Sequence, residues 1–264
     1  MHIVVCVKQV PDTTDVRIDP ETNALIRDGV ASILNPFDEN AIETALQLRE
    51  KHGGKVSVLS MGPPQAVEVL RHALAMGADE AYLISDPALR GSDTLATSYT
   101  LAEAIRYLGD FDMVICGKQA IDGDTAQVGP GIAERLNIPQ VTLAVGVEVD
   151  GRKVRVTRLL DVANEVVEVR MPVLITVVKQ INEPRHPPMK GVLRAKKAQI
   201  PVLTAADLDL DPKQIGFAGS PTWVWKVFTP PRRQRGEMIE GDLQHKIDAL
   251  VEKILSLGIV SRSN

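Results

Sequence analysis

The feature of this sequence that most constrains its fold is the alternation of short apolar runs with stretches of helical spacing. The runs are rich in β-branched residues, as expected of strands buried on both faces. They lie at residues 3–7, 56–59, 81–84 and 113–116. Segments of about 10–15 residues with helical spacing separate them, which predicts βαβ units with right-handed crossovers. We therefore expect an α/β fold with a Rossmann-like parallel sheet flanked by helices.

Two local signals lie between the first two runs. Strand-like residues 16–18 and 24–26 flank the turn residues 20–23, which predicts a small hairpin. Asn35 followed by Pro36 predicts an N-cap and the first position of a helix, which Gly53 and Gly54 would end.

The pattern changes after Pro139. Residues 141–149, 153–160, 166–169 and 173–178 are strand-like, and Asp150-Gly151 is a hairpin signal, so we expect an antiparallel β addition. Residues 201–240 have weak periodicity and predict an extended C-terminal arm, which an amphipathic helix over residues 243–257 would end. The predicted domains are a nucleotide-binding α/β domain at residues 1–200 and the arm with its helix at residues 201–264.

Composition excludes several classes of protein. Only 3% of the 264 residues are aromatic, which argues against a nucleic-acid platform that stacks bases. The formal net charge of -4 argues against a general binder of polyanions. No apolar stretch approaches the length of a membrane span, and the five His lack metal-ligand spacing. Cys6 and Cys116 lie singly in apolar runs, so we expect a cytoplasmic protein with two buried thiols and no metal.

The mild net charge hides an uneven distribution. Residues 1–149 hold 11 Lys and Arg against 21 Asp and Glu, whereas residues 150–200 hold 11 against 5. The segregation either reflects the accident of exposed strands and helices or marks a basic segment that meets an acidic partner. Both interpretations stay open at the level of sequence.

The richest candidate site is the loop at residues 117–130. Ligands of parallel sheets bind at the carboxyl ends of strands, and this loop leads from such an end into a helix. Gly117 lets the backbone turn off the strand, and Gly123 permits a positive φ or a close ligand approach. The helix start offers free N–H groups to a phosphate, with Thr125 and Gln127 adding side-chain bonds.

Two points about this loop stay open. The helix could begin at Thr125 or nearer Pro130. Asp122 and Asp124 would repel a phosphate that they faced, so they either cap the helix and fix the loop or bind ribose hydroxyls.

A second candidate is the segment at residues 91–98. Ser92 or Asp93 would cap a helix that carries Thr94 and Thr97 on one face. Threonines are poor helix formers, so capping alone does not explain them. Small hydroxyls at a helix start would suit a second phosphate or the edge of a flavin.

The sequence offers no pairing of a nucleophile with a base, so we predict no catalytic residue. A nucleotide site without acid–base groups suggests a redox carrier, in which the cofactor supplies the chemistry.

Several motifs, taken in order along nearly the whole chain, resemble the beta subunit of electron transfer flavoproteins. They are residues 5–11 (Val-Cys-Val-Lys-Gln-Val-Pro), 35–38 (Asn-Pro-Phe-Asp), 73–79, 117–124, 182–185 (Asn-Glu-Pro-Arg) and 195–197 (Ala-Lys-Lys). The resemblance implies a heterodimer with an alpha subunit that carries one FAD. It implies either AMP in the beta subunit or, in the electron-bifurcating branch, a second FAD that takes hydride from NADH.

Residues 91–98, and residues 219–222 through 228–230, resemble the bifurcating branch, which we therefore favour. In that branch one electron passes to the alpha-subunit FAD and an acceptor dehydrogenase, and the other passes to ferredoxin or flavodoxin. The cofactor contacts implied by the resemblance and by the two candidate segments are Cys6, Asn35, Asp38, Met61, Asp93, Thr94, Thr97, Gly117, Lys118, Gln119, Asp122, Gly123, Asp124, Thr125, Gln127 and Val128.

The resemblance also implies a docking region. Residues 184–197 are similar to the family's partner-docking loop and the helix after it, with Met189 as an apolar side chain that would enter a partner dehydrogenase. The implied docking residues are Pro184, Arg185, Met189, Lys190, Lys196 and Lys197. Trp223 and Trp225 share one face of an extended arm, where they pack either on their own core or on a partner chain.

Two alternatives remain at this stage. The chain could be a non-bifurcating subunit that binds AMP and relays electrons from acyl-CoA dehydrogenases. It could also be a stand-alone module that binds or hydrolyses adenine nucleotides, which rests on the α/β core and the phosphate loop alone.

Overall fold

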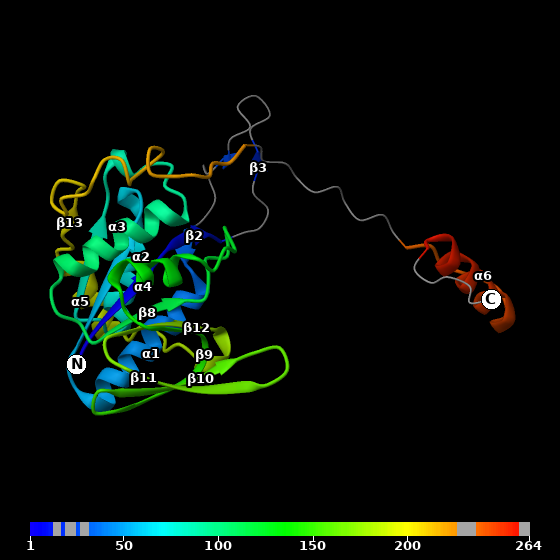
Figure 1. Cartoon of the computed structure of the whole chain (residues 1–264), viewed down its shortest axis with the longest axis horizontal. Coiled ribbons are helices and arrows are strands. Elements are labelled where there is room, and N and C mark those ends of the chain that lie inside the picture. Colours follow the sequence, from blue (N-terminus) through cyan, green and yellow to red (C-terminus); the bar gives the residue numbers. More distant parts are fainter. Residues whose placement is uncertain (13–16, 19–24, 27–31, 226–235, 259–264) are drawn as a thin grey trace. The chain divides into compact units, whose positions relative to one another are not determined.

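The computed structural model describes residues 1–12, 17–18, 25–26, 32–225 and 236–258 (Figure 1). Its α-helices are α1 (Pro36–His52), α2 (Val67–Met76), α3 (Thr94–Tyr107), α4 (Val128–Leu136), α5 (Met189–Lys197) and α6 (Leu243–Ser256). Short 3-10 helices lie at η1 (Pro64–Ala66), η2 (Pro87–Leu89) and η3 (Lys179–Ile181). The strands are β1 (His2–Val7), β2 (Gln9–Pro11), β3 (Arg17–Ile18), β4 (Leu25–Ile26), β5 (Ser32–Leu34), β6 (Lys55–Met61), β7 (Glu80–Ile84), β8 (Met113–Gly117), β9 (Gln140–Asp150), β10 (Lys153–Leu159), β11 (Asn164–Arg170), β12 (Val173–Val177) and β13 (Val202–Leu203).

A 9-stranded sheet in the order β11-β10-β9-β12-β8-β1-β6-β7-β13 forms the centre of the fold. Each neighbouring pair in the run β9-β12-β8-β1-β6-β7-β13 is parallel, which confirms the parallel sheet predicted from the alternating pattern. Strands β10 and β11 extend it in antiparallel pairing, as the hairpin signal predicts. The small hairpin expected near residue 20 is present as the antiparallel pair β3 and β4.

The extent of the antiparallel addition differs from the prediction. Strand β12 is parallel to β8, and the first half of β9 is parallel to β12, so both belong to the core sheet. All five residues of β12 are buried, because helices cover both faces of the sheet at this position. Its unbroken apolar character is typical of a central parallel strand.

Two hydrophobic layers cover the sheet. Helices α1, α2 and α5 pack on one face, where Ile42, Leu46 and Leu70 are fully buried. Helices α3 and α4 pack on the other face around Ile105 and Ile132. Because the strands of the core sheet are parallel, their carboxyl ends lie at one edge of the sheet, and the candidate loops emerge from this edge.

The first compact unit runs from Met1 to Val227, beyond the boundary expected at residue 200. The reason is a set of apolar side chains that join the core layer of α3 and α4. They are Leu203, Leu208, Leu210 and Ile215. The first part of the predicted arm is thus packed, and β13 adds to the sheet beside β7.

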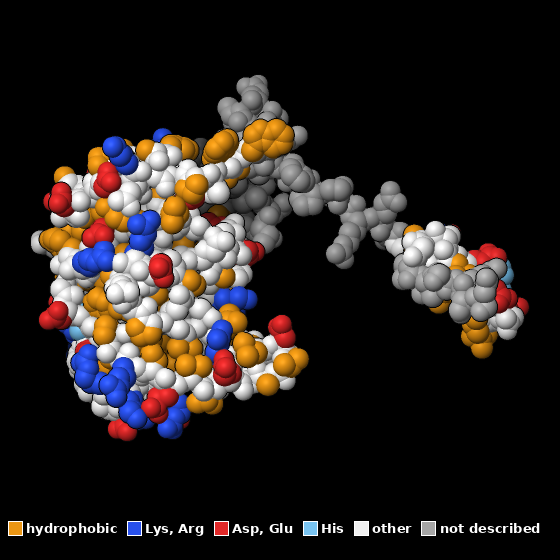
Figure 2. Space-filling model, viewed as in Figure 1, with side chains coloured by type: hydrophobic (Ala, Val, Ile, Leu, Met, Phe, Trp, Pro, Cys, Tyr) orange, Lys and Arg blue, Asp and Glu red, His pale blue; other side chains and the backbone are white. Residues whose placement is uncertain are grey.

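The second unit spans residues 228–264 and contains α6, the amphipathic helix predicted from the sequence. Asp242 caps the helix by accepting a hydrogen bond from the His245 N–H at 2.8 Å. Figure 2 shows hydrophobic side chains along one edge of this helix, and Leu243, Leu250 and Val251 are among those exposed. Among the described helices, none has the length and apolar character needed to cross a membrane.

Candidate functional site

The candidate site lies where β1, β6 and β8 end at the carboxyl edge of the sheet. Cys6 of β1 and Cys116 of β8 are neighbours in register, and both thiols are buried as predicted. Contact with the Cys6 thiol, together with burial, raises the pKa of the Cys116 thiol. Met61 ends β6 at the same edge and is half-buried.

The start of α1 closes this edge from one side. Asn35 is the N-cap residue by position, as predicted, but its side chain makes no cap bond. Its amide instead donates to the Gln119 carbonyl at 2.9 Å and accepts from the Ile121 N–H at 3.1 Å. Asp38, in the first turn, accepts the N–H groups of Lys8 and Gly117. Both side chains thus bond to the backbone of the strand exits.

The loop after β8 is fixed by its own acidic residues. Asp122 accepts from the Lys8 ammonium at 2.8 Å through both carboxylate oxygens. Asp124 accepts from the Gln119 side chain at 2.6 Å. These bonds agree with the expected loop-fixing role of the two aspartates, although neither caps α4. Contact of either aspartate with ribose hydroxyls stays a prediction.

The helix after this loop begins at Val128, with Gln127 as its N-cap residue. The chain reaches it through positive φ angles at Asp124 (51°) and Ala126 (54°), whereas Gly123 has no positive φ. A Cβ placed on Gly123 would meet nothing within 4 Å, so neither φ nor packing in the protein requires a glycine here, and a close approach by a ligand stays a prediction.

This loop has the features that a nucleotide phosphate requires. The N-terminus of α4 has no side-chain cap bond, and because Pro130 has no N–H and the Gly131 N–H bonds to the Gln127 carbonyl, the N–H groups of Val128 and Gly129 are the ones its first turn can offer to an anion. Thr125 and Gln127 are exposed beside it, and Val128 is half-buried. Lys118 is half-buried, and its N–H donates to the Val177 carbonyl at 2.8 Å. The residues present therefore fit the phosphates of a bound AMP or FAD.

The second candidate segment lies beside the first. The Thr94 hydroxyl donates to the Gln127 side-chain oxygen at 2.9 Å, which joins the start of α3 to the start of α4. Thr97 lies one turn along α3 and is half-buried. By contrast, the hydroxyls of Ser92 and Ser98 donate to carbonyls of their own segment, at Leu89 and Leu95.

Asp93 caps α3 and also fixes the arm. One of its oxygens accepts from the N–H groups of Leu95 and Ala96, and the other accepts from the backbone and hydroxyl of Thr222. The pKa of the Asp93 carboxyl is lowered by these hydrogen bonds, although burial opposes the shift. A direct contact of Asp93 with a cofactor stays a prediction, as do the contacts expected at residues 228–230, which lie outside the described residues.

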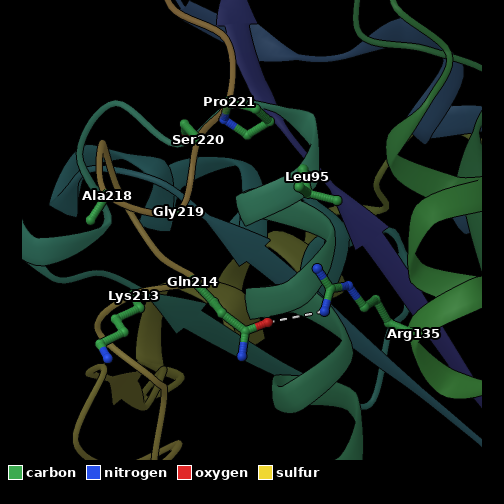
Figure 3. A pocket seen from close by; sticks show the side chains of 8 residues that line it. All are labelled: Leu95, Arg135, Lys213, Gln214, Ala218, Gly219, Ser220 and Pro221. Atoms are coloured by element: carbon green, nitrogen blue, oxygen red, sulfur yellow. Dashed lines mark hydrogen bonds between the residues drawn. The ribbon is translucent and has the colours of Figure 1, made fainter.

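A hollow of about 360 Å³ lies between α3 and the arm, beside the start of α3 (Figure 3). Leu95 and Pro221 line its upper part, and Arg135 bonds across to Gln214 at 3.1 Å. The Arg135 guanidinium also lies over the Tyr99 ring at 5.4 Å. The contacts of Arg135 are thus made within the chain.

The predicted docking loop is bound to α1. Arg185 donates to Glu43 at 2.7 Å and also pairs with Glu50. The two carboxylates raise the pKa of Arg185 above its usual value, and the Arg185 bond lowers the pKa of Glu50. Asn182 and Asn40 exchange hydrogen bonds at 2.9–3.1 Å. Pro184 is half-buried between these contacts.

The helix after this loop presents exposed docking candidates. Met189 is 74% exposed at the start of α5, and Leu193, one turn later, is 55% exposed. Lys190, Lys196 and Lys197 are exposed on the same helix. Trp223 and Trp225 are 74% and 88% exposed, so neither packs on the described core.

The basic segment is partly neutralised within the chain. Lys153, Arg155 and Arg158 form ion pairs with glutamates of the neighbouring strands, and Arg152 pairs with Asp112. Figure 2 shows basic and acidic side chains intermixed at the lower edge, where Figure 1 labels β10 and β11. Within the described residues, Lys190, Lys196 and Lys197 have no such ion pair, so they remain the candidates for an acidic partner.

Sequence reasoning missed two residues of these sites. Lys8 pairs with Asp122 across 114 positions of the chain, and a basic residue directly after a buried strand was the available signal. Leu193 extends the exposed apolar surface of Met189. Its signal was an apolar residue one helical turn from Met189.

Comparison with known proteins adds to this geometry. Residues 22–208 match the family model described as electron transfer flavoprotein domain. The chain is 52% identical to the electron transfer flavoprotein subunit beta of Thermoanaerobacterium thermosaccharolyticum, over 98% of this chain and 100% of that protein. It is 52% identical to the subunit beta of Megasphaera elsdenii, with the same coverage. It is 47% identical to subunit CarD of the caffeyl-CoA reductase–Etf complex of Acetobacterium woodii, over 98% of this chain and 100% of that protein. The chain therefore belongs to the electron transfer flavoprotein family and is similar over its length to the beta subunits of that family.

Proposed function

We propose that this chain is the FAD-binding beta subunit of a heterodimeric, cytoplasmic electron transfer flavoprotein of the bifurcating type. In this proposal the beta-subunit FAD accepts hydride from NADH. One electron passes to the alpha-subunit FAD and a flavin- or quinone-linked dehydrogenase, and the other passes to ferredoxin or flavodoxin. The observation that carries the proposal is the 2.9 Å bond between Thr94 and Gln127, which joins a second polar segment to the phosphate loop.

Each group of residues has a distinct part in this proposal. The uncapped start of α4 and the exposed loop before it would bind the pyrophosphate through N–H groups. Thr94 and Thr97 would offer neutral hydroxyls to the flavin, which needs hydrogen bonds beyond the phosphates. When bound, FAD accepts two electrons as hydride and can release them singly, which the side chains here cannot do.

A second candidate is an AMP-binding, non-bifurcating subunit that relays electrons from acyl-CoA dehydrogenases. The observation in its favour is that the phosphate loop is complete without α3, since Asp122 and Asp124 are fixed by Lys8 and Gln119. A mononucleotide would need this loop alone.

The cofactor count distinguishes the two candidates. Purified with its alpha subunit, the complex is expected to contain two FAD, whereas one FAD and one AMP would contradict the bifurcating proposal. Replacing Thr94 and Thr97 together by Val removes both hydroxyls and should lower FAD retention in this subunit by about tenfold. Thr157→Val, in β10, is the matched control and should leave FAD content unchanged. An equal FAD content in all three proteins would remove the two threonines from the flavin site.

The exposed apolar side chains indicate which surfaces would bind the partner proteins. The apolar edge of α6 and the two exposed tryptophans would bind the alpha subunit, because large apolar surfaces left in water favour association. Met189 and Leu193, flanked by lysines, would bind the acceptor dehydrogenase.

Met189→Ala should slow electron transfer to the dehydrogenase by about tenfold, because a truncated central contact weakens the encounter complex. Both flavins should stay bound, since Met189 lies on α5, away from the phosphate loop. Stopped-flow measurement of dehydrogenase reduction checks this, with the exposed Val166→Ala of β11 as the control. An unaltered rate in Met189→Ala would remove this residue from the docking surface.

A further inference from the structure

The side chain of Asp38 connects the ends of two neighbouring strands. One carboxylate oxygen accepts the Lys8 N–H at 2.8 Å, directly after β1. The other accepts the Gly117 N–H at 3.2 Å, at the last residue of β8. Asp38 is only 5% exposed. Each of its carboxylate oxygens is therefore engaged by one backbone N–H group of a strand exit.

Asn35 makes a corresponding connection one turn earlier. Its side chain bonds to the Gln119 carbonyl and the Ile121 N–H, so it holds the first part of the loop after β8. Together the two side chains fix the start of α1 against both strand exits. The candidate phosphate loop begins at these exits, and its position depends on these bonds.

We propose that Asp38 is a positioning residue of the nucleotide site, whose ionised carboxylate fixes the distance between the exits of β1 and β8. This inference rests on the proposed nucleotide-binding function. Both N–H groups need an acceptor, and an ionised carboxylate offers one oxygen to each. A protonated carboxyl turns one oxygen into a donor, which weakens its bond to one of the two strand exits.

The surroundings of Asp38 place its ionisation in the physiological range. Burial raises the pKa of Asp38 to about 7, against the lowering by the Asn35 side chain, the two backbone N–H groups and the Lys8 charge. Lys8 is itself paired with Asp122, and the neighbouring thiols of Cys6 and Cys116 contribute no charge in their neutral form. Nucleotide binding should therefore weaken as the pH falls through about 7.

Stability should change in the opposite direction. The folded pKa of Asp38 lies above its ordinary value of 3.8, so the folded state holds an additional proton between these two values. The contribution of Asp38 to stability is largest below this window and is lost as the pH rises towards 7. Nucleotide affinity and stability should therefore change in opposite directions with pH. A variant that only damaged the fold would not show this difference.

The test is FAD binding to the full chain by calorimetry between pH 6 and pH 8. FAD is the probe because its diester phosphates do not titrate in this range, whereas the AMP phosphate does. At pH 6 about one tenth of Asp38 is ionised, so wild-type affinity should be about tenfold lower than at pH 8. Asp38→Asn should bind FAD weakly at both pH values, with no such pH dependence.

Asp112→Asn is the matched control. Asp112 accepts the His2 N–H at 2.9 Å and so connects β8 with β1 at the opposite end of the same strands. This variant should keep the wild-type affinity for FAD and its pH dependence. If Asp112→Asn loses both, the effect of Asp38→Asn reflects general damage to the sheet, and the inference is wrong.

Two further outcomes separate the inference from the proposed function. If the wild-type chain binds FAD but Asp38→Asn has the same affinity and pH profile, the inference alone is overturned. If the wild type binds neither FAD nor AMP, the proposed function fails. Hydrogen exchange then decides on the connection itself. The protection factors of the Lys8 and Gly117 amides should be lower in Asp38→Asn than in the wild type, and in the wild type they should be lower at pH 6 than at pH 8. Unchanged protection of both amides would overturn it.

Discussion

Arg185→Ala should lower the free energy of unfolding by about 3–5 kcal/mol, because it leaves a buried charge without its partner. The Glu43 side chain is only 5% exposed, and Arg185 donates to both of its oxygens at 2.7 Å and 3.0 Å. Without the guanidinium, the remaining side-chain donor to Glu43 is the Gln47 amide. Urea denaturation followed by circular dichroism measures the loss.

An exposed ion pair supplies the comparison. Arg155 lies on β10 with 58% of its side chain exposed and pairs with Glu148 and Glu168 at 3.7 Å and 3.8 Å. Arg155→Ala should cost about 1 kcal/mol or less, because exposed pairs contribute little. Adding Glu43→Gln to Arg185→Ala should recover part of the lost stability by removing the unpaired charge. Equal losses in the two arginine variants would show that Arg185 does not support the loop.

This result would assign Arg185 a role different from that of Met189. Arg185 would hold the docking loop on α1, and Met189 would contact the partner. Loss of docking in Arg185→Ala would then follow from a displaced loop.

Gly117→Ala is expected to abolish stable nucleotide retention. A Cβ at this position would collide with the Asp38 carboxylate and would lie 2.7 Å from the Phe37 Cβ. Since neither the strand nor the helix start can move freely, α1 would be pushed away from the exit of β8. We expect a stability loss of about 1–3 kcal/mol, typical of overpacking, and at least about a tenfold loss of FAD affinity. Calorimetry and thermal unfolding measure the two effects.

Gly123→Ala distinguishes an effect on stability from an effect on nucleotide binding at the same loop. Its Cβ would meet no protein atom within 4 Å and its φ is not positive, so stability should stay within about 0.5 kcal/mol of wild type. Nucleotide affinity should nevertheless fall, because the methyl group would occupy the space of a closely approaching ligand. Wild-type affinity in Gly123→Ala would place the nucleotide elsewhere than against this loop.

The fold was predictable where local pattern decides it. The alternating apolar runs correctly predicted β1, β6, β7 and β8, and Asn35-Pro36 marked the start of α1. Chain direction in β12 was not predictable from its own residues, because parallel pairing with β8 depends on partners about 60 positions away. The packing of residues 203–215 was missed for a similar reason. Its four buried apolar residues have neither helical nor strand spacing, so the sequence pattern gave no sign that they contact the core.

The candidate site was predictable in its location but not in its bonds. Glycines and the helix start after β8 pointed to the phosphate loop. The pairing of Lys8 with Asp122 and the bonds of Asn35 to the loop join residues more than 80 positions apart. Sequence also could not place the start of α4, because Gln127 occupies the N-cap position without making the cap bond that identifies such residues.

The central place of β1 in the sheet has a consequence for how the protein is made. Strand β1 pairs with β6 about 50 residues later in the chain and with β8 about 110 residues later. Until the ribosome has released residue 117, the edge of β1 that pairs with β8 leaves its backbone N–H and C=O groups unpaired, and such open edges promote aggregation. High contact order of this kind also slows folding. The nascent chain should therefore depend on protection by chaperones until β8 is available, and truncations that end before β8 should accumulate as insoluble protein.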